Sequence, residues 1–312
     1  MILLVKSDGE AAVPEWRHWF GQFAPSLEVR WWDDPGVDPA QVRYVFVWQP
    51  DHGRIAGFPH LRLVLSDAAG VGHITADPTL PAHLPLVRMV NPETGQRMAE
   101  YACMMALALL RDLPRSIARQ RARQWDEFTQ PRTARQTRVG VMGLGQLGTA
   151  AAAALAALGF QVAGWATRPR DLPGIACFAG DAMLAAFLAR TDILINLLPE
   201  TPATRGILRA ETLALLPPGA GLVQAGRGSH LVLRDLLAAL DSGHLAGAAI
   251  DVFEREPLPD DHPAWSHPRI IVTAHGAAFD TREGRARTAA AAIAADLLGE
   301  PVPNLYDPAR GY

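Results

Sequence analysis

The sequence predicts an α/β protein with parallel sheets, because short apolar segments alternate with segments of helical pattern along most of the chain. Turn-forming residues separate the apolar segments, as at residues 33–36 and 49–51. A glycine-rich turn at residues 143–148 joins one apolar segment directly to an alanine-rich helix. At 312 residues, the chain is long enough for two such domains.

The first part of the chain predicts a smaller, flavodoxin-like α/β domain. Its apolar runs favour β-strands at residues 2–5, 27–31, 44–48 and 63–65. A long apolar helix is expected at residues 95–110, after the Asn91-Pro92 pair.

Residues 139–148 read Val-Gly-Val-Met-Gly-Leu-Gly-Gln-Leu-Gly, which is typical of a Rossmann-type dinucleotide-binding turn. Gly143 would allow the tight turn, Gly145 would let a pyrophosphate approach the backbone, and Gly148 would let the helix pack closely. The helix N-terminus would offer free N–H groups to the phosphates. The alternative is a glycine turn that only packs. The expected cofactor contacts in the turn are Gly143, Leu144, Gly145, Gln146, Leu147 and Gly148.

A new series of strands begins at this turn and predicts a second sheet. The expected strands are residues 138–142, 161–165, 193–197, 221–224, 246–250 and 270–272. These six strands suffice for a dinucleotide-binding sheet, so the last helix, residues 280–298, would cross back to the first domain. We therefore expect a discontinuous substrate-binding domain, a dinucleotide-binding domain inserted in it, and a ligand cleft at the two hinges. The substrate-binding domain would comprise residues 1–98 and 282–312, and the dinucleotide-binding domain residues 99–281.

The end of the second strand of this series favours NADP(H) over NAD(H). NAD sites usually carry an acidic residue there, which bonds the ribose 2′-hydroxyl. This chain has Thr167, Arg168 and Arg170 instead. Arg168 can pair with a 2′-phosphate and Thr167 can add a hydroxyl, so we expect NADPH to be preferred and NADH to be possible. The alternative is that both arginines are solvated loop charges.

Composition argues against several classes of protein. The net charge of −3 gives no indication of nucleic-acid binding. Cys103 and Cys177 lie far apart and form neither a disulfide framework nor a zinc-binding spacing. The ten histidines show no paired-ligand pattern, the first apolar run is too short for a signal peptide, and no run reaches membrane-spanning length. We expect a cytoplasmic protein without a metal, nucleic-acid or membrane partner.

Three charged residues follow predicted strands of the second sheet, at the edge where α/β proteins bind ligands: Arg227, Glu256 and His275. Reduction of a carbonyl beside a carboxylate needs a guanidinium that holds the carboxylate and polarises the carbonyl. It also needs an acid effective near neutral pH, and a carboxylate that orients this acid and keeps it protonated. These residue types fit that reaction. Alternatively, the arginine bonds loop carbonyls, the glutamate caps a turn, and the histidine is structural.

Taken together, the motifs resemble those of the D-isomer-specific 2-hydroxyacid dehydrogenase family, and the likeness extends over essentially the whole chain. They are the glycine turn, Ala-Gly-Arg-Gly at 225–228, Asp-Val-Phe-Glu-Arg-Glu-Pro at 251–257 and His-Gly-Ala-Ala at 275–278. Within the family, the chain most resembles the glyoxylate/hydroxypyruvate reductase A branch. The motifs Val-Trp-Gln-Pro at 47–50 and Ile-Asn-Leu-Leu-Pro at 195–199 point there.

This resemblance implies roles for individual residues. Arg227 would bind the substrate, His275 would be the acid/base catalyst, and Glu256 would be the partner of His275. Glu254, two positions earlier, would not be that partner, because the family's glutamate directly precedes the proline. If Glu256 failed this role, Glu254 would be the next candidate.

The resemblance also implies further contacts with substrate and cofactor. Backbone N–H groups in the loop of residues 68–71 would bind the substrate carboxylate, and Trp48 would line the pocket beside them. The loop residues concerned are Ala69, Gly70 and Val71. The expected cofactor contacts outside the glycine turn are Thr167, Arg168, Leu198, Pro199, Ala225 and Asp251.

The chain departs from the family's pattern at several positions. It has Gln224 where the family commonly has Asn, Ala274 in place of Pro, and Gly72 in place of Asp. The first two are expected to change backbone rigidity more than chemistry, and Gly72 bears on the shape of the carboxylate loop. The basic residue after the second strand of the cofactor domain commonly stands one position before Arg168.

The sequence therefore predicts a reductase that transfers hydride from NADPH to a small 2-oxo acid, glyoxylate or hydroxypyruvate. Two alternatives stay open: a dehydrogenase for a larger 2-oxo acid, and a non-enzymatic nucleotide-sensing protein of the same superfamily. The nucleotide-sensing alternative would be indicated by an added peptide-binding or disordered tail, and nothing in the sequence resembles one.

Apolar residues in the segment 98–128 exceed what one domain edge needs, and the family resemblance favours a homodimer built around this segment. The alternative is that the helix simply packs under the nucleotide-binding sheet. The apolar residues are Met104, Met105, Leu107, Leu109 and Leu110.

Overall fold

The computed structural model describes residues 1–129 and 131–308, which form two compact units. Unit 1 consists of Met1–Glu93 together with the chain from Asp280 onward, and unit 2 is Thr94–Phe279. The last helix of the chain thus belongs to the same unit as the first strand.

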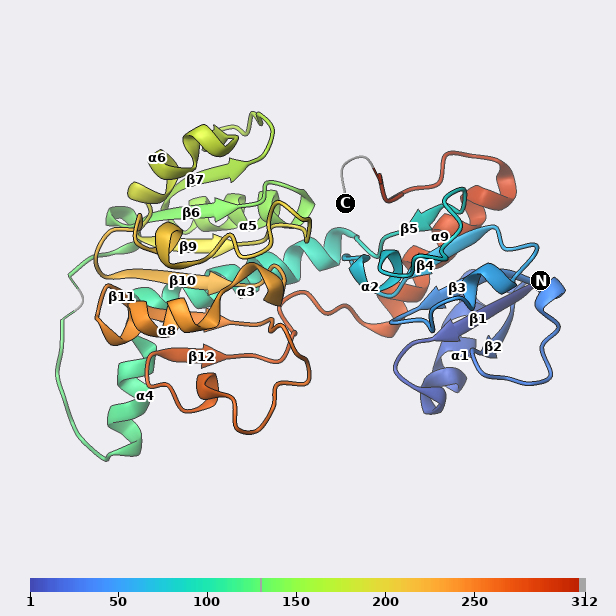
Figure 1. Cartoon of the computed structure of the whole chain (residues 1–312), viewed down its shortest axis with the longest axis horizontal. Coiled ribbons are helices and arrows are strands. Elements are labelled where there is room, and N and C mark those ends of the chain that lie inside the picture. Colours follow the sequence, from blue (N-terminus) through green and yellow to red (C-terminus); the bar gives the residue numbers. More distant parts are fainter. Residues whose placement is uncertain (130, 309–312) are drawn as a thin grey trace. The chain divides into compact units, whose positions relative to one another are not determined.

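Unit 1 is built on a parallel sheet with the strand order β2-β1-β3-β4-β5, which is the flavodoxin-like order (Figure 1). The strands are β1 (Ile2–Lys6), β2 (Glu28–Trp31), β3 (Val42–Val47), β4 (Leu63–Ser66) and β5 (Leu86–Val87). The sequence did not predict β5, which is only a two-residue strand at the edge of the sheet.

Helices cover both faces of this sheet. Trp16 and Phe20 of α1 (Val13–Phe23) and Ile293 of α9 (Arg282–Leu298) bury one face. Trp32 and Ile74 pack on the opposite face, the latter from the short helix α2 (Gly72–Thr75). Because both faces are covered, the strands read as continuous apolar runs rather than as alternating ones.

Within the described residues, unit 2 holds a seven-stranded sheet with the order β12-β11-β10-β9-β6-β7-β8, and every neighbouring pair is parallel. The strands are β6 (Arg138–Met142), β7 (Gln161–Ala166), β8 (Ala176–Ala179), β9 (Ile193–Asn196), β10 (Ala220–Gln224), β11 (Leu245–Ile250) and β12 (Ile270–Val272). The prediction of six strands was wrong, because β8 was missed. This strand lies at the sheet edge, is only partly buried, and has the weakly apolar sequence Ala-Cys-Phe-Ala.

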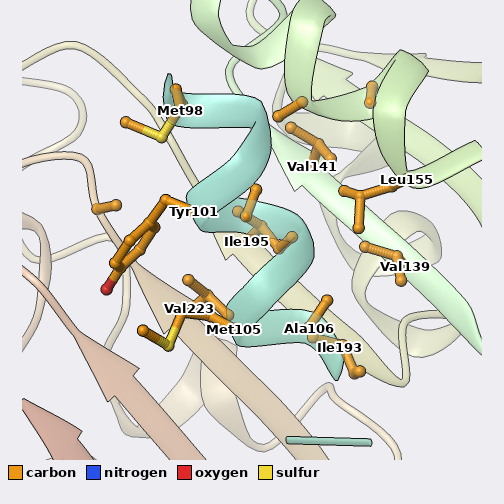
Figure 2. Packing of buried hydrophobic residues seen from close by; sticks show 14 of the residues in the cluster. Met98, Tyr101, Met105, Ala106, Val139, Val141, Leu155, Ile193, Ile195 and Val223 are labelled. Atoms are coloured by element: carbon orange, nitrogen blue, oxygen red, sulfur yellow. The ribbon is translucent and has the colours of Figure 1, made fainter. Parts of the chain in front are cut away.

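Two groups of helices enclose the second sheet. Val141 and Ile195 point toward α3 (Pro92–Leu110) and α5 (Gln146–Ala157), as Figure 2 shows for the side chains around α3. Leu194 and Leu222 point to the other face. Successive residues of a strand face opposite sides, which explains this division. The helices on the other face are α6 (Leu184–Ala189), α7 (Ala210–Leu213) and α8 (Leu233–Asp241).

Helix α3 only partly follows the expectation of a dimer surface. Met105 is buried in the core of unit 2, and Leu109 and Leu110 are half-buried against it, so these residues do pack under the sheet. Met104 and Leu107 instead point outward and are 54% and 37% exposed. Exposed apolar residues continue in and after α4 (Leu113–Arg121) with Leu113 and Trp125.

Short 3₁₀ helices complete the described structure, at Glu10–Ala12, Pro39–Gln41, Ile55–Gly57, Ala134–Gln136, Asp181–Met183, Gly228–His230 and Pro263–Trp265. Across the described ranges, no helix combines the length and apolarity needed to span a membrane. Since all strands of unit 2 run in one direction, their carboxyl ends meet at a single edge of the sheet.

Candidate active site

The glycine turn between β6 and α5 is shaped by close backbone contacts. Gly143 has a φ of +96°, a left-handed conformation that favours glycine. A Cβ on Gly148 would lie 1.7 Å from the carbonyl oxygen of Gly143, so only glycine fits there. A Cβ on Gly145 would meet nothing within 4 Å, which leaves the backbone at this point open to a ligand.

The N-terminus of α5 begins directly at this open point and fits a phosphate group. Its N-cap, Gly145, provides no side-chain cap for the first turn. Free N–H groups and the positive end of the helix dipole bind anions. Leu144 is buried beside Gly164 of β7, so it offers only its backbone, whereas Gln146 is exposed.

Thr167 and Arg168 directly follow β7, the strand next to β6, and both are exposed. Arg168 and Arg170 pair with no carboxylate among the described residues. The guanidinium of Arg168 therefore has its full hydrogen-bonding capacity available for an anionic group such as a 2′-phosphate.

Arg227 lies in the turn that follows β10, and its guanidinium donates to the carbonyl of Gly226 at 2.7 Å. Burial lowers the pKa of Arg227, while the negative charges of Glu200 and Glu256 act in the opposite direction. An arginine in this setting keeps its positive charge at neutral pH. The site thus contains a half-buried, charged guanidinium near two carboxylates.

A buried polar network holds the turn of Arg227. The amide of Asn196 donates to Oε1 of Gln224 at 2.7 Å and to Nδ1 of His230 at 3.0 Å. Gln224 donates to the carbonyl of Arg227 at 2.7 Å, and the N–H of Arg227 donates to Nδ1 of His230 at 3.2 Å. Burial lowers the pKa of His230 to about 4, and the charge of Arg227 acts in the same direction. The neutral imidazole can therefore accept these bonds.

His275 and Glu256 lie together after β12 and β11. Nδ1 of His275 is 2.7 Å from Oε2 of Glu256, and Oε1 of Glu256 accepts the N–H of Phe253 at 2.8 Å. Burial would raise the pKa of Glu256, but the bonds from His275 and Phe253 and the charge of Arg227 outweigh it and lower this pKa. Glu254 is exposed and has no part in the pair. Nε2 of His275 stays available to a ligand.

The backbone of His275 has a φ of +48°, which costs about 1–3 kcal/mol for a residue other than glycine. Asp251, 1% exposed, fixes this conformation. Its carbonyl accepts the N–H of His275 at 2.8 Å, and its carboxylate accepts the N–H groups of Gly276 and Ala277 at 2.9 and 3.0 Å. The hydroxyl of Thr273 donates to the same carboxylate at 2.6 Å. The side chain of Asp251 is thus occupied within the protein.

The other expected cofactor residues of unit 2 lie at the same edge of the sheet. Leu198 is buried, and its N–H donates to Oδ1 of Asn196 at 3.2 Å. The carbonyl of Pro199 accepts the hydroxyl of Thr204 at 2.8 Å. Ala225 is buried and follows β10, where its N–H donates to the carbonyl of Asn196.

In unit 1, the loop of residues 68–71 turns its carbonyls toward the protein. The carbonyl of Ala69 accepts from Arg88 at 2.8 Å, and that of Gly70 accepts from the hydroxyl of Ser66 at 3.3 Å. In the part of the chain that the structure describes, the N–H groups of Ala69, Gly70 and Val71 donate to no protein acceptor. Successive free N–H groups of this kind can accept an anion such as a carboxylate.

Trp48 follows β3 in the same unit. Its ring lies 4.2 Å, centroid to centroid, from the ring of His73, which belongs to α2 at the end of the carboxylate loop. The half-buried indole of Trp48 therefore packs against α2, which begins directly after the loop of residues 68–71.

Sequence reasoning did not identify the supporting network of Asn196, Gln224, His230 and Thr273. One signal was present: a polar residue stands at the carboxyl end of an otherwise apolar strand in β9 and in β10, and directly after β12. No comparable signal marks His230, which lies in a 3₁₀ helix.

Comparison with known proteins agrees with this arrangement. The family model "D-isomer specific 2-hydroxyacid dehydrogenase, NAD binding domain" matches residues 103–277. Over 304 residues, 96% of each chain, the protein is 39% identical to the glyoxylate/hydroxypyruvate reductase A of Serratia proteamaculans.

Two solved structures are similar along the whole chain. A D-isomer specific 2-hydroxyacid dehydrogenase from Xanthobacter autotrophicus Py2, in complex with NADPH and MES, has a TM-score of 0.93 and 41% identity, covering 100% of this chain and 99% of that one. The NADPH-dependent glyoxylate/hydroxypyruvate reductase from Sinorhizobium meliloti, in complex with NADP and sulfate, has a TM-score of 0.90 and 36% identity over the same shares. The resemblance drawn from the motifs is confirmed: the chain belongs to the D-isomer-specific 2-hydroxyacid dehydrogenase family.

Proposed function

We propose that this chain is an NADPH-preferring reductase that converts small 2-oxo acids, glyoxylate and hydroxypyruvate, to 2-hydroxy acids. One observation carries the proposal: His275 and Glu256 are paired at 2.7 Å on the sheet edge that also holds Arg227 and the glycine turn. Similarity to named glyoxylate/hydroxypyruvate reductases over nearly the full length supports the choice of substrate.

NADPH, when bound, would supply the hydride. The glycine turn and the N-terminus of α5 would hold its pyrophosphate, and Thr167 with Arg168 would hold the 2′-phosphate. Further contacts would come from Leu198, Pro199 and Ala225. The buried carboxylate of Asp251 would support the turn that carries His275.

The substrate would be bound by its carboxylate and its carbonyl oxygen. We assign the carboxylate to the N–H groups of Ala69, Gly70 and Val71 and to the guanidinium of Arg227, with Trp48 lining the pocket. Arg227 would also polarise the carbonyl, because it is a fixed positive charge in a half-buried site.

His275 would donate the proton that the substrate oxygen needs when hydride reaches the neighbouring carbon. Nδ1 is bonded to Glu256, so Nε2 is the nitrogen that would face the substrate. The negative charge of Glu256 favours the imidazolium form before transfer and orients the ring. The same pair, running in reverse, would accept a proton from a 2-hydroxy acid.

The experiment that tests this function is NADPH oxidation with a panel of 2-oxo acids of increasing size. Glyoxylate and hydroxypyruvate are expected to give the highest kcat/KM, and His275→Ala should lower kcat by about 10²–10⁴. Highest activity on a larger 2-oxo acid would overturn the substrate assignment. Cofactor binding without reduction of any 2-oxo acid would favour the nucleotide-sensing alternative.

A second prediction concerns Glu256 and pH. Its lowered pKa keeps the carboxylate ionised at neutral pH, and this charge is lost only as the pH falls below the ordinary range of a glutamate. Glu256→Gln removes the charge but keeps the shape. The limb on which reduction falls with rising pH should then move to lower pH, because the imidazolium loses its counter-charge. Glu254→Gln is the matched control and should keep the parent profile. Superimposable profiles for both variants would refute the role of Glu256.

The third prediction concerns cofactor choice. Arg168→Asp should weaken kcat/KM for NADPH about ten- to a hundredfold and leave the value for NADH nearly unchanged, because a charge-assisted phosphate contact contributes roughly 1.5–3 kcal/mol. Arg170→Asp, two positions further along the same exposed loop, serves as the control. If kcat/KM for NADPH stays within about twofold, Arg168 is a solvated loop charge.

We also propose a homodimer built around residues 98–128, supported by the outward-facing Met104, Leu107, Leu113 and Trp125. Light scattering at micromolar concentration should give twice the mass of the chain. The double variant Met104→Asp/Leu107→Asp places two charges on this surface and should have the mass of a single chain. The control Leu298→Asp, at an exposed leucine of α9, should keep the mass of a dimer. A single-chain mass for the parent would contradict the proposal.

We further propose that the protein is cytoplasmic. This proposal is supported by Cys103 and Cys177, which are both free thiols.

A further inference from the structure

A buried cluster of charged groups lies in unit 1, and none of its members has been assigned a role so far. At its centre is Arg285 in the first turn of α9, which is only 3% exposed. Its guanidinium donates to the carboxylate of Asp67, to Oδ2 of Asp8 at 2.7 Å and to the hydroxyl of Ser7 at 3.3 Å. It also lies 5.0 Å from the centre of the Trp16 ring. The arginine is therefore fixed on several sides.

Asp67 is the member of this cluster that connects it to the substrate loop. It follows β4 and directly precedes residues 68–71. Its N–H donates to the carbonyl of Val47 at 3.0 Å, and its Oδ2 accepts the hydroxyl of Ser7 at 2.8 Å. Both its backbone and its side chain are thus anchored, and the loop begins at the next residue.

The charge of Asp67 needs compensation. Burial raises the pKa of Asp67 to about 6, and the charge of Arg285 with the bond from Ser7 works in the opposite direction. Without Arg285, Asp67 would keep the hydroxyl of Ser7 as a partner but would lose its ion pair with α9, and its pKa would rise further. The anchor of the loop would be weakened, and any carboxylate that stayed ionised would repel a substrate carboxylate held by the three N–H groups that follow.

We propose that Arg285 is a positioning residue for the substrate: through Asp67 it fixes the start of the carboxylate loop and neutralises the negative charge beneath it. This inference rests on the proposed function, in which the N–H groups of Ala69, Gly70 and Val71 hold the substrate carboxylate. It assigns a role in substrate affinity to a residue of the last helix, which is distant from the loop in sequence.

The test is Arg285→Met, with three measurements: KM and kcat for glyoxylate, the Kd of NADPH, and the Kd of oxamate, an unreactive analogue of a 2-oxo acid, by calorimetry. KM and the oxamate Kd should rise about ten- to a hundredfold, the scale on which misplacement of a binding group acts. kcat at saturation and the NADPH Kd should stay within about twofold. Unchanged KM and oxamate affinity would overturn the proposal.

Arg282→Met is the matched control. Arg282 lies in the same turn of α9 and pairs with Asp8 at 2.7 Å and with Glu15, but it does not contact Asp67. It should leave KM within about twofold of the parent. Equal increases in KM for Arg282→Met and Arg285→Met would show a general loosening of α9 and would refute a specific role for Arg285.

Two further variants keep the proposal testable if Arg285→Met folds poorly. Arg285→Lys keeps the charge and should recover most of the affinity. Asp67→Asn combined with Arg285→Met removes the unpaired carboxylate, so it should bind oxamate more tightly than Arg285→Met alone. Absence of both recoveries would overturn the proposal. A parent protein that neither reduces a 2-oxo acid nor binds oxamate would instead show that the proposed function is wrong.

Discussion

The candidate site in unit 2 depends on the hydrogen bonds that the buried carboxylate of Asp251 accepts. It accepts hydrogen bonds from the hydroxyl of Thr273 and from the N–H groups of Gly276 and Ala277, and thereby holds His275 in a left-handed backbone conformation. Tyr101 of α3 is 2.9 Å from the same Thr273 hydroxyl, so the long helix under the sheet is connected to the turn that carries the histidine. Without this carboxylate, the N–H groups of Gly276 and Ala277 would lose the fixed acceptor that supports the left-handed turn.

Much of the fold was predictable because local physics decides it. The glycine turn follows from backbone geometry alone: a Cβ at Gly148 would collide with the carbonyl of Gly143. Arg227 and His275 were found because parallel strands bring their carboxyl ends to one edge, wherever these residues lie in the sequence. Family resemblance then separated Glu256 from Glu254, and the geometry shows the former paired with His275.

The supporting residues could not be predicted because they depend on the order of the strands in the sheet. Asn196 can donate to Gln224 because β9 lies beside β10, and the spacing of residues in the sequence does not show which strands are neighbours. The pairing of Arg285 with Asp67 depends on a helix that returns to the first unit after the whole of the second.

The return of α9 has a consequence for the synthesis of the protein. Trp16 and Phe20 of α1 share their core with Ala286 and Ile293, which the ribosome adds about 270 residues later, an interval of roughly tens of seconds. Until α9 has been synthesised, the apolar side chains of unit 1 that it covers stay in contact with water. By then the sequence of unit 2 is already complete. Such an exposed apolar face is prone to aggregation and is a natural target for chaperones during translation.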